Sequence, residues 1–186
     1  AHVPVTANIL CVLWKESGGE HQLRTDMKGS IWRLYMQMSQ YVWKRHVEEH
    51  ELRDASRERV FDGLGNIAFD ALKRGQILID QNLVESYSET QNLAINLKTC
   101  GLLLLKLEGA HYQFPHLTFQ EYFAGSHLAT MLCGANGTER RSAETFLKLN
   151  KYNTTYEGML QFAVEEARHR HGIDWFRKMM SVVSRQ

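Results

Sequence analysis

Apolar residues recur at helical spacing in two long stretches of the first half of the chain. In the first stretch, from Met27 to about Glu51, polar residues occupy the opposite face and the apolar positions are Ile31, Leu34, Tyr35, Met38 and Val42. The second stretch repeats this spacing at Val60, Leu64, Ile67, Ala68 and Ala71, and Gly75 follows as a stop signal. The pattern therefore predicts two amphipathic helices, which the charged stretch 45–59 separates.

The pattern changes after Gly75, where short strand and helix signals alternate. Residues 76–79 predict a short strand, Asp80 is placed to cap a one-turn helix through Val84, and Glu89 to Lys98 predict another short helix. Two apolar runs with a glycine turn between them then predict a β-hairpin over about 102–114. Helices followed by a hairpin are the order of elements in a winged helix.

The hairpin leads into the most apolar helix that the sequence predicts. Thr118 and Glu121 have the spacing of a capping box, and Leu117 and Tyr122 have that of a hydrophobic staple. The predicted helix, from Phe119 to about Leu132, is apolar almost all round, which indicates packing on more than one side. His116 precedes this helix start, where backbone N–H groups favour anions.

Helical patterns also begin and end the chain. Residues 3–15 predict a short buried helix with Pro4 in its first turn, where a missing N–H costs nothing. Three helical patterns follow the loop 134–138, at 139–149, 156–164 and 173–183. The predicted fold class is therefore mainly α with a small β-hairpin.

The stretch from Phe114 to Ala124 resembles the signature Phe-x-His-x-[Ser/Thr]-Phe-Gln-Glu-[Phe/Tyr]-Phe-Ala-Ala of NACHT proteins. These are signal-transducing NTPases that include the NOD-like receptors and many bacterial relatives. Within this signature only Gly125 departs, from the usual alanine. The resemblance implies that His116 belongs to a winged-helix domain and touches the β-phosphate of ADP bound on a neighbouring NTPase domain. It also implies that Pro4 packs near the adenine, although from the residues alone Pro4 merely starts a helix.

The resemblance is strongest over 99–132 and extends more weakly along the chain. Cys100-Gly-Leu-Leu is similar to the family's Ser-Gly-Leu-Leu, and Leu34-Tyr35 to its Leu-Tyr helix. It implies a winged-helix domain at 53–133 flanked by helical-bundle segments. Residues 1–52 would end the small helical domain after the NTPase core, and 134–186 would start a second helical domain.

The implied function is regulatory and non-catalytic. The implied partners are the NTPase core of the same chain and, in the active state, other copies of the protein, in a cytoplasmic signalling or defence pathway. The resemblance implies a longer parent protein that contains the NTPase core. ADP or ATP with magnesium would bind that core, because this sequence has no G-x-x-x-x-G-K-[ST] loop of its own. The first residues, without an initiator Met or a signal peptide, look like the start of a fragment.

Composition and charge reduce the number of possible functions and locations. The formal net charge of +1 gives no electrostatic argument for nucleic acid or a membrane surface, and no apolar run reaches the ~20 residues that span a bilayer. Cys11, Cys100 and Cys133 form no disulfide framework, which favours reduced, cytosolic thiols. Hydrophobic residues make up 44% and charged residues 23%, as in ordinary globular domains.

Two other function classes stay open at this stage. A DNA-binding winged helix would use 89–98 for recognition, but that stretch offers only Lys98 for phosphates. A helical scaffold for protein binding overlaps the leading hypothesis.

Two short motifs match known sites by spacing alone. His46-Val-Glu-Glu-His50 has the H-x-x-E-H spacing of a zinc hydrolase, and Gly63-x-Gly65 has the spacing of a dinucleotide loop. Both fall within helical patterns, so neither a metal site nor a dinucleotide site is expected.

Overall fold

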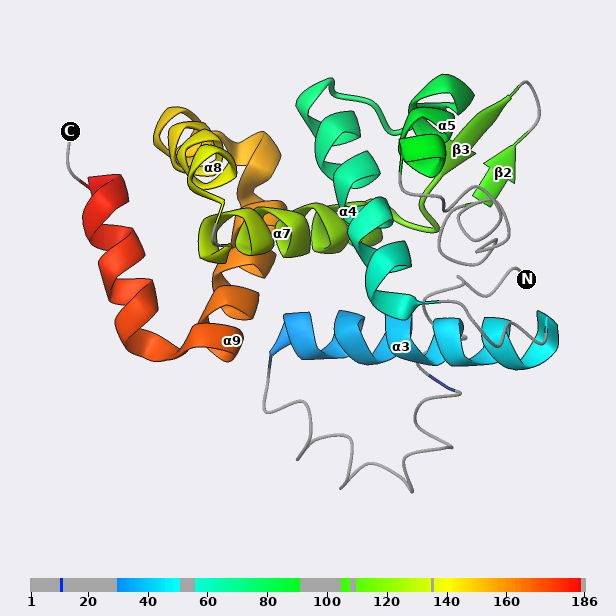
Figure 1. Cartoon of the computed structure of the whole chain (residues 1–186), viewed down its shortest axis with the longest axis horizontal. Helices are drawn as coiled ribbons and strands as arrows, with labels where there is room; N and C mark the ends of the chain where they lie inside the picture. The colour runs from blue at the N-terminus through cyan, green and yellow to red at the C-terminus, as the bar shows by residue number, and fades with distance from the viewer. Residues whose placement is uncertain are drawn as a thin grey trace.

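The computed structural model describes residues 11, 30–50, 56–90, 105–107, 110–134 and 136–184. Within these ranges the chain is mainly helical, as predicted, and has a small antiparallel sheet (Figure 1). The elements are α3 (Ile31–His50), α4 (Arg57–Lys73), β1 (Ile79–Asp80), α5 (Gln81–Thr90), β2 (Leu105–Leu107), β3 (His111–Gln113), α7 (Leu117–Cys133), α8 (Gly137–Asn150), η1 (Thr154–Tyr156) and α9 (Glu157–Ser184).

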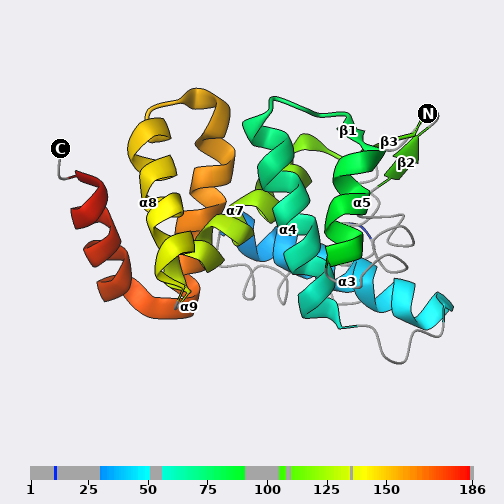
Figure 2. The same ribbon diagram turned by 45° about the horizontal axis from the view of Figure 1, so that its top comes forward.

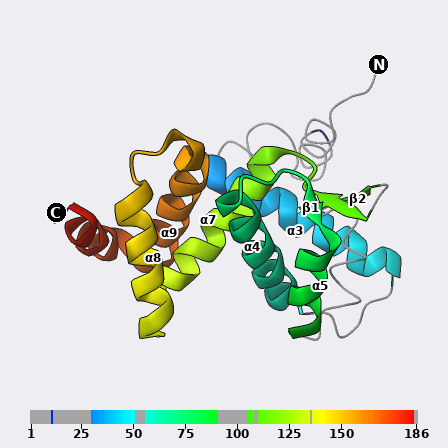
Figure 3. The ribbon, with the colours of Figure 1, turned by 90° about the horizontal axis from the view of Figure 1, so that it is seen from above.

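Helix α7 is central to the arrangement. It packs most extensively against α4 and α9, and α3 lies along the same body (Figures 1 and 2). The sheet and α5 lie at one end of the molecule, and α8 and α9 lie at the other (Figure 3). Phe119, Phe123 and Leu128 of α7 are at most 1% exposed, which confirms that this helix is covered on several sides.

The two amphipathic helices of the first half form close to the predicted places. All five predicted apolar positions of α4 are fully buried, and Gly75 ends the helix in a left-handed conformation with φ 67°. The Gln76 N–H donates to the Ala71 carbonyl and the Gly75 N–H to the Leu72 carbonyl, which is a Schellman motif. In α3 the predicted positions Tyr35, Met38 and Val42 are buried, and the first turn differs, because Ile31 is 40% exposed whereas Trp32 is 4% exposed.

The sheet has three strands rather than the hairpin alone. Its order is β1-β3-β2, and Tyr112 of β3 pairs with Ile79 on one side and Lys106 on the other. The strand predicted at 76–79 is displaced to 79–80, because the Schellman motif keeps the chain turning after Gly75. In the structure Ile77 and Leu78 are 59% and 53% exposed.

Helix α5 is longer than the single turn predicted. It spans Gln81–Thr90, and the Asp80 carboxylate does not cap it but faces His111 Nε2 at 3.5 Å. The predicted helix at 89–98 falls almost entirely outside the described residues. So do the helix at 3–15 with Pro4, residues 102–104 of the first hairpin strand, and residues 108 and 109 of its turn.

The last third of the chain follows its three helical patterns. The first pattern is α8, and the other two are continuous in α9 except at Gly172, whose φ of 76° and ψ of 178° are not helical. Beyond Gly172 the helix changes direction (Figure 2). Met159, Phe162 and Ala163, before this change of direction, are buried.

Candidate functional site

His116 stands at the start of α7, where β3 and Phe114 lead the chain out of the sheet. The N-cap residue is His116 and not Thr118, so the predicted capping box is wrong by two positions. The physical reason is that the imidazole Nδ1 accepts from the Thr118 N–H at 3.3 Å, as a capping oxygen would. Thr118 therefore lies inside the helix, and Leu117, the predicted outer half of a staple, is 42% exposed.

Thr118 connects His116 to α3. Its hydroxyl Oγ1 lies 2.8 Å from His116 Nδ1 and 2.5 Å from the Tyr35 hydroxyl. In the tautomer in which Nδ1 accepts from the Thr118 N–H, the neutral ring carries its proton on Nε2. Tyr35 is 7% exposed and packs edge-on against Phe119, with ring centroids 4.9 Å apart. The sequence identified Tyr35 as an apolar helix position and as part of the Leu-Tyr resemblance, but did not predict this contact.

His116 itself is exposed, and its Nε2 has no partner among the described residues. A ring held at one nitrogen and open at the other presents a fixed N–H donor to the surroundings. The start of α7 adds the partial positive charge of a helix N-terminus. Together these features suit a negatively charged group, and the contact with a phosphate stays a prediction.

Glu121 does not fold back over the start of the helix. Instead its carboxylate lies against α9, because Gly158 has no side chain, and a Cβ built there would come within 2.6 Å of the carboxylate oxygens. Burial raises the pKa of Glu121, and the nearby His116 opposes that rise. The structure therefore assigns Glu121 a place in the α7–α9 contact rather than the reciprocal half of a capping box.

The next residues of the motif attach α7 to its neighbours. The Gln120 side chain is 1% exposed, and its Nε2 donates to the Gln76 carbonyl at 2.9 Å, next to the Schellman turn. Phe123 packs against Phe61 of α4 and Phe114, with ring centroids 5.5 and 5.8 Å apart. The exposed His116 is thus attached to a closely packed part of the fold.

Two glycines permit close helix packing around α7. A Cβ at Gly125 would lie 2.6 Å from the Met159 carbonyl oxygen and 2.7 Å from the Phe162 Cβ, so α9 can approach only because this residue has no side chain. The departure from alanine at this point of the motif thus has a local structural reason. A Cβ at Gly65 would lie 3.0 Å from the His127 Cβ, and Gly65 lies inside α4, not in a dinucleotide-binding loop.

The histidine pair 46 and 50 gains no support as a zinc site. His46 is 6% exposed, packed near Trp43, and Glu49 forms an ion pair with Arg45 at 3.1 Å. The His50 side chain lies outside the described residues. Across the described ranges, no three His, Cys, Asp or Glu side chains are grouped so as to hold a metal ion.

Neither a scan against protein-family models nor a search of curated proteins gives a match. None of the helices in the described part of the chain has the length and apolar character needed to cross a membrane.

Proposed function

We propose that this chain is a non-catalytic regulatory region of a NACHT-type NTPase, in which a winged helix senses bound ADP and gates oligomerisation and signalling. The observation that carries the proposal is the state of His116. Its imidazole is fixed through Nδ1 at the start of α7, and Nε2–H is exposed, within a stretch that matches the NACHT signature.

The order of elements supports the winged-helix part of the proposal. Helix α4, strand β1, helix α5 and the hairpin of β2 and β3 follow one another, and β3 lies between β1 and β2 in the sheet. Residues 91–104, which would complete the domain, lie outside the described ranges. The domain limits 1–52, 53–133 and 134–186 stay predictions.

In the proposed mechanism the His116 Nε2–H donates a hydrogen bond to the β-phosphate of ADP on the neighbouring NTPase core. A hydrogen bond to a charged group contributes about 1.5–3 kcal/mol. If the contact forms only in the closed, ADP-bound state, it shifts the ratio of closed to open protein by about one to two decades. Exchange for ATP removes the contact and frees the protein to oligomerise, which is a ligand-biased two-state switch.

Tyr35 gives this switch a connection to the preceding segment. Its hydroxyl bonds to Thr118, which in turn bonds to the imidazole that would contact the phosphate. Under the proposal, α3 belongs to the helical domain that follows the NTPase core. A displacement of α3 would therefore disturb the orientation of the His116 ring. Pro4, for which the resemblance implies an adenine contact, lies outside the described residues.

Nucleotide and magnesium belong to the parent protein under this proposal. The chain has no Walker A loop, so we expect it neither to hydrolyse ATP nor to bind ADP tightly by itself. Its partners would be the NTPase core of the same chain and further copies of the protein in the active state.

The experiment that tests the proposal is nucleotide analysis of the complete parent protein. His116→Asn keeps a good capping side chain but removes the imidazole donor, and His111→Asn on β3 is the matched control. We expect His116→Asn to lower the amount of co-purified ADP and to raise basal oligomerisation, and His111→Asn to change neither. Wild-type ADP content and an unchanged monomer fraction in His116→Asn would contradict the proposed role.

A further inference from the structure

A cavity of about 470 Å³ lies between α3, α4, α7 and α9, on residues that the proposed switch does not use. This volume falls in the range of small-molecule sites. Its apolar lining includes Trp32 and Met36 of α3, Phe61 of α4 and Tyr122 of α7. Aromatic rings from three helices therefore surround a space with charged groups at its edges.

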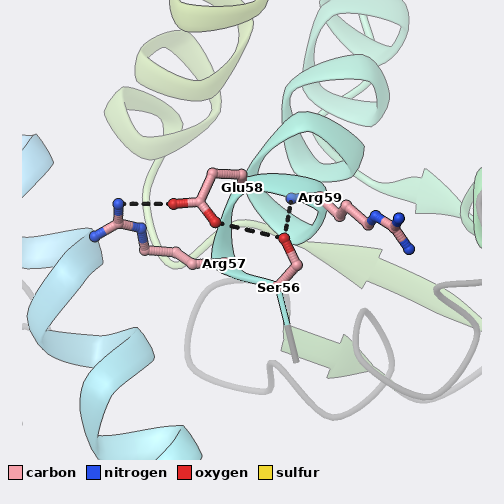
Figure 4. A network of polar contacts seen from close by, with 4 residues as sticks. All are labelled: Ser56, Arg57, Glu58 and Arg59. Carbon is pink, nitrogen blue, oxygen red and sulfur yellow. Dashed lines mark hydrogen bonds and ion pairs between the residues drawn. The ribbon is translucent and has the colours of Figure 1, made fainter. Parts of the chain in front are cut away.

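The two arginines that line the cavity already have carboxylate partners. Arg57 Nη2 lies 2.9 Å from Glu58 Oε1 (Figure 4). Arg170 is paired in the same way with Glu166, which is 2% exposed and also accepts from Trp32 Nε1 at 3.2 Å. The charge of each arginine is therefore already balanced by a neighbouring carboxylate.

The carboxylate of Asp62 differs from these groups in its contacts. Asp62 is exposed and lines the cavity, and its carboxylate has no hydrogen bond or ion pair within the described ranges. Burial raises the pKa of Asp62, the carboxylates of Glu58 and Glu166 raise it further, and only Arg170 opposes them. The lining therefore has one more carboxylate than guanidinium groups, and Asp62 is the carboxylate without an ion pair in the described part of the chain.

Two histidines also line the cavity: His169, whose ring centroid lies 4.7 Å from that of Trp32, and His127. His127 lies on α7 in the same lining, and burial lowers the pKa of its imidazole below the ordinary 6.5, so the ring is neutral near pH 7. An ammonium group would pair with Asp62, and aromatic faces attract organic cations as well.

We propose that this cavity binds a small organic ammonium ion, whose charged group pairs with Asp62 and whose apolar part packs against Trp32, Phe61 and Tyr122. The inference is independent of the proposed nucleotide sensing. The ligand class follows from the unpaired carboxylate, the paired arginines and the aromatic walls.

Three probes of nearly the same shape test the charge requirement on the whole chain. They are 2-phenylethylammonium, the neutral 2-phenylethanol and the anionic phenylacetate, each titrated calorimetrically at pH 7. We expect the ammonium ion to bind with a Kd of about 1 mM or tighter, and at least about tenfold more tightly than the other two. Equal binding of the ammonium ion and the alcohol, tighter binding of phenylacetate, or no binding of the ammonium ion would overturn the proposal.

A matched pair of variants tests the position. Asp62→Asn should weaken binding of 2-phenylethylammonium by about tenfold or more, whereas Asp80→Asn, on the sheet, should leave it unchanged. Thermal unfolding checks the fold, and Asp62→Asn should not lower Tm, because it neutralises a carboxylate without a partner. If both variants bind like the wild type, the site is not at Asp62. If Asp62→Asn does not fold, the comparison of the three probes on the wild-type chain still decides.

Discussion

Nδ1 and Nε2 of His116 serve different purposes at the start of α7. Nδ1 accepts from the Thr118 N–H and so caps the first turn of α7. Any good capping side chain can perform this structural task. Nε2 is exposed and is the atom that the proposed function uses. The two tasks can be separated, because Asn retains a capping acceptor, whereas its shorter side chain places no N–H at the position of Nε2.

Capping predicts a stability difference between two His116 variants of this chain. His116→Leu removes the acceptor for the Thr118 N–H and should lower the free energy of unfolding by about 0.5–2 kcal/mol, as the loss of a cap does elsewhere. His116→Asn should stay close to the wild type. Urea unfolding measures both, and equal stability of the two variants would show that Nδ1 does not cap α7. The sequence alone, without this cap, predicts no cost for His116→Leu in the isolated chain.

The raised pKa of Glu121 predicts how the stability of the folded chain changes with pH. Burial raises its pKa above the ordinary 4.5, so its contribution to stability is fully present below that value and is lost as the pH rises through the raised pKa. Glu121→Gln removes this loss. The variant should therefore gain in Tm relative to the wild type on going from pH 4 to pH 7. A gain that is the same at both pH values would contradict the assigned burial against α9.

At the scale of elements, the contact between α7 and α9 depends on the absence of one side chain. A Cβ at Gly125 would meet backbone atoms of α9, the Met159 carbonyl oxygen and the Ala163 nitrogen, at 2.6 and 2.9 Å. Backbone cannot move aside as the end of a flexible side chain can. The helices must therefore separate if this position gains a methyl group.

Gly125→Ala should accordingly destabilise the chain, by about 1–3 kcal/mol, as overpacking does in other cores. The control is Gly137→Ala at the start of α8, where a new Cβ would meet nothing within 4 Å, and where Ala is the better helix former. Denaturant unfolding of the pair should give opposite signs. A neutral or stabilising Gly125→Ala would mean that α7 and α9 are not packed this closely.

Elements with a clear period could be predicted from the sequence, and non-local partners could not. The spacing of Val60, Leu64 and Ile67 predicted α4, and the glycine at 75 predicted its end. The displaced strand β1 could not be inferred, because it depends on pairing with β3, more than thirty residues later in the chain. Local spacing cannot show which distant residue supplies a partner.

The same limit applies to the sites. The motif around His116 is contiguous, so the sequence was sufficient to select that residue, although not the Tyr35–Thr118 contact that holds it. The cavity joins Trp32, Asp62, Tyr122 and Glu166 from four helices, and no sequence spacing connects them. The charge balance of the cavity depends on the ion pairs of Arg57 and Arg170, and residue spacing does not predict both of them.

At the scale of the whole molecule, segments from the beginning and end of the described chain are joined. Glu165 of α9 accepts from the Ser30 hydroxyl and from the Trp32 N–H at the start of α3, and Glu166 accepts from the Trp32 ring. Helix α7 lies between α4 and α9 and carries His116 at its exposed start. In the proposed function this body moves as a unit on or off the nucleotide-bearing core.

The most direct test of the central claim is the affinity of this chain for the separately prepared NTPase core of its parent protein, loaded with ADP or with ATP. The account predicts at least about tenfold tighter binding to the ADP-loaded core, from one hydrogen bond to a charged group. It also predicts that His116→Asn removes this difference while His111→Asn retains it. Equal affinity of the wild-type chain for both forms of the core, or an undiminished ADP preference in His116→Asn, would contradict the account.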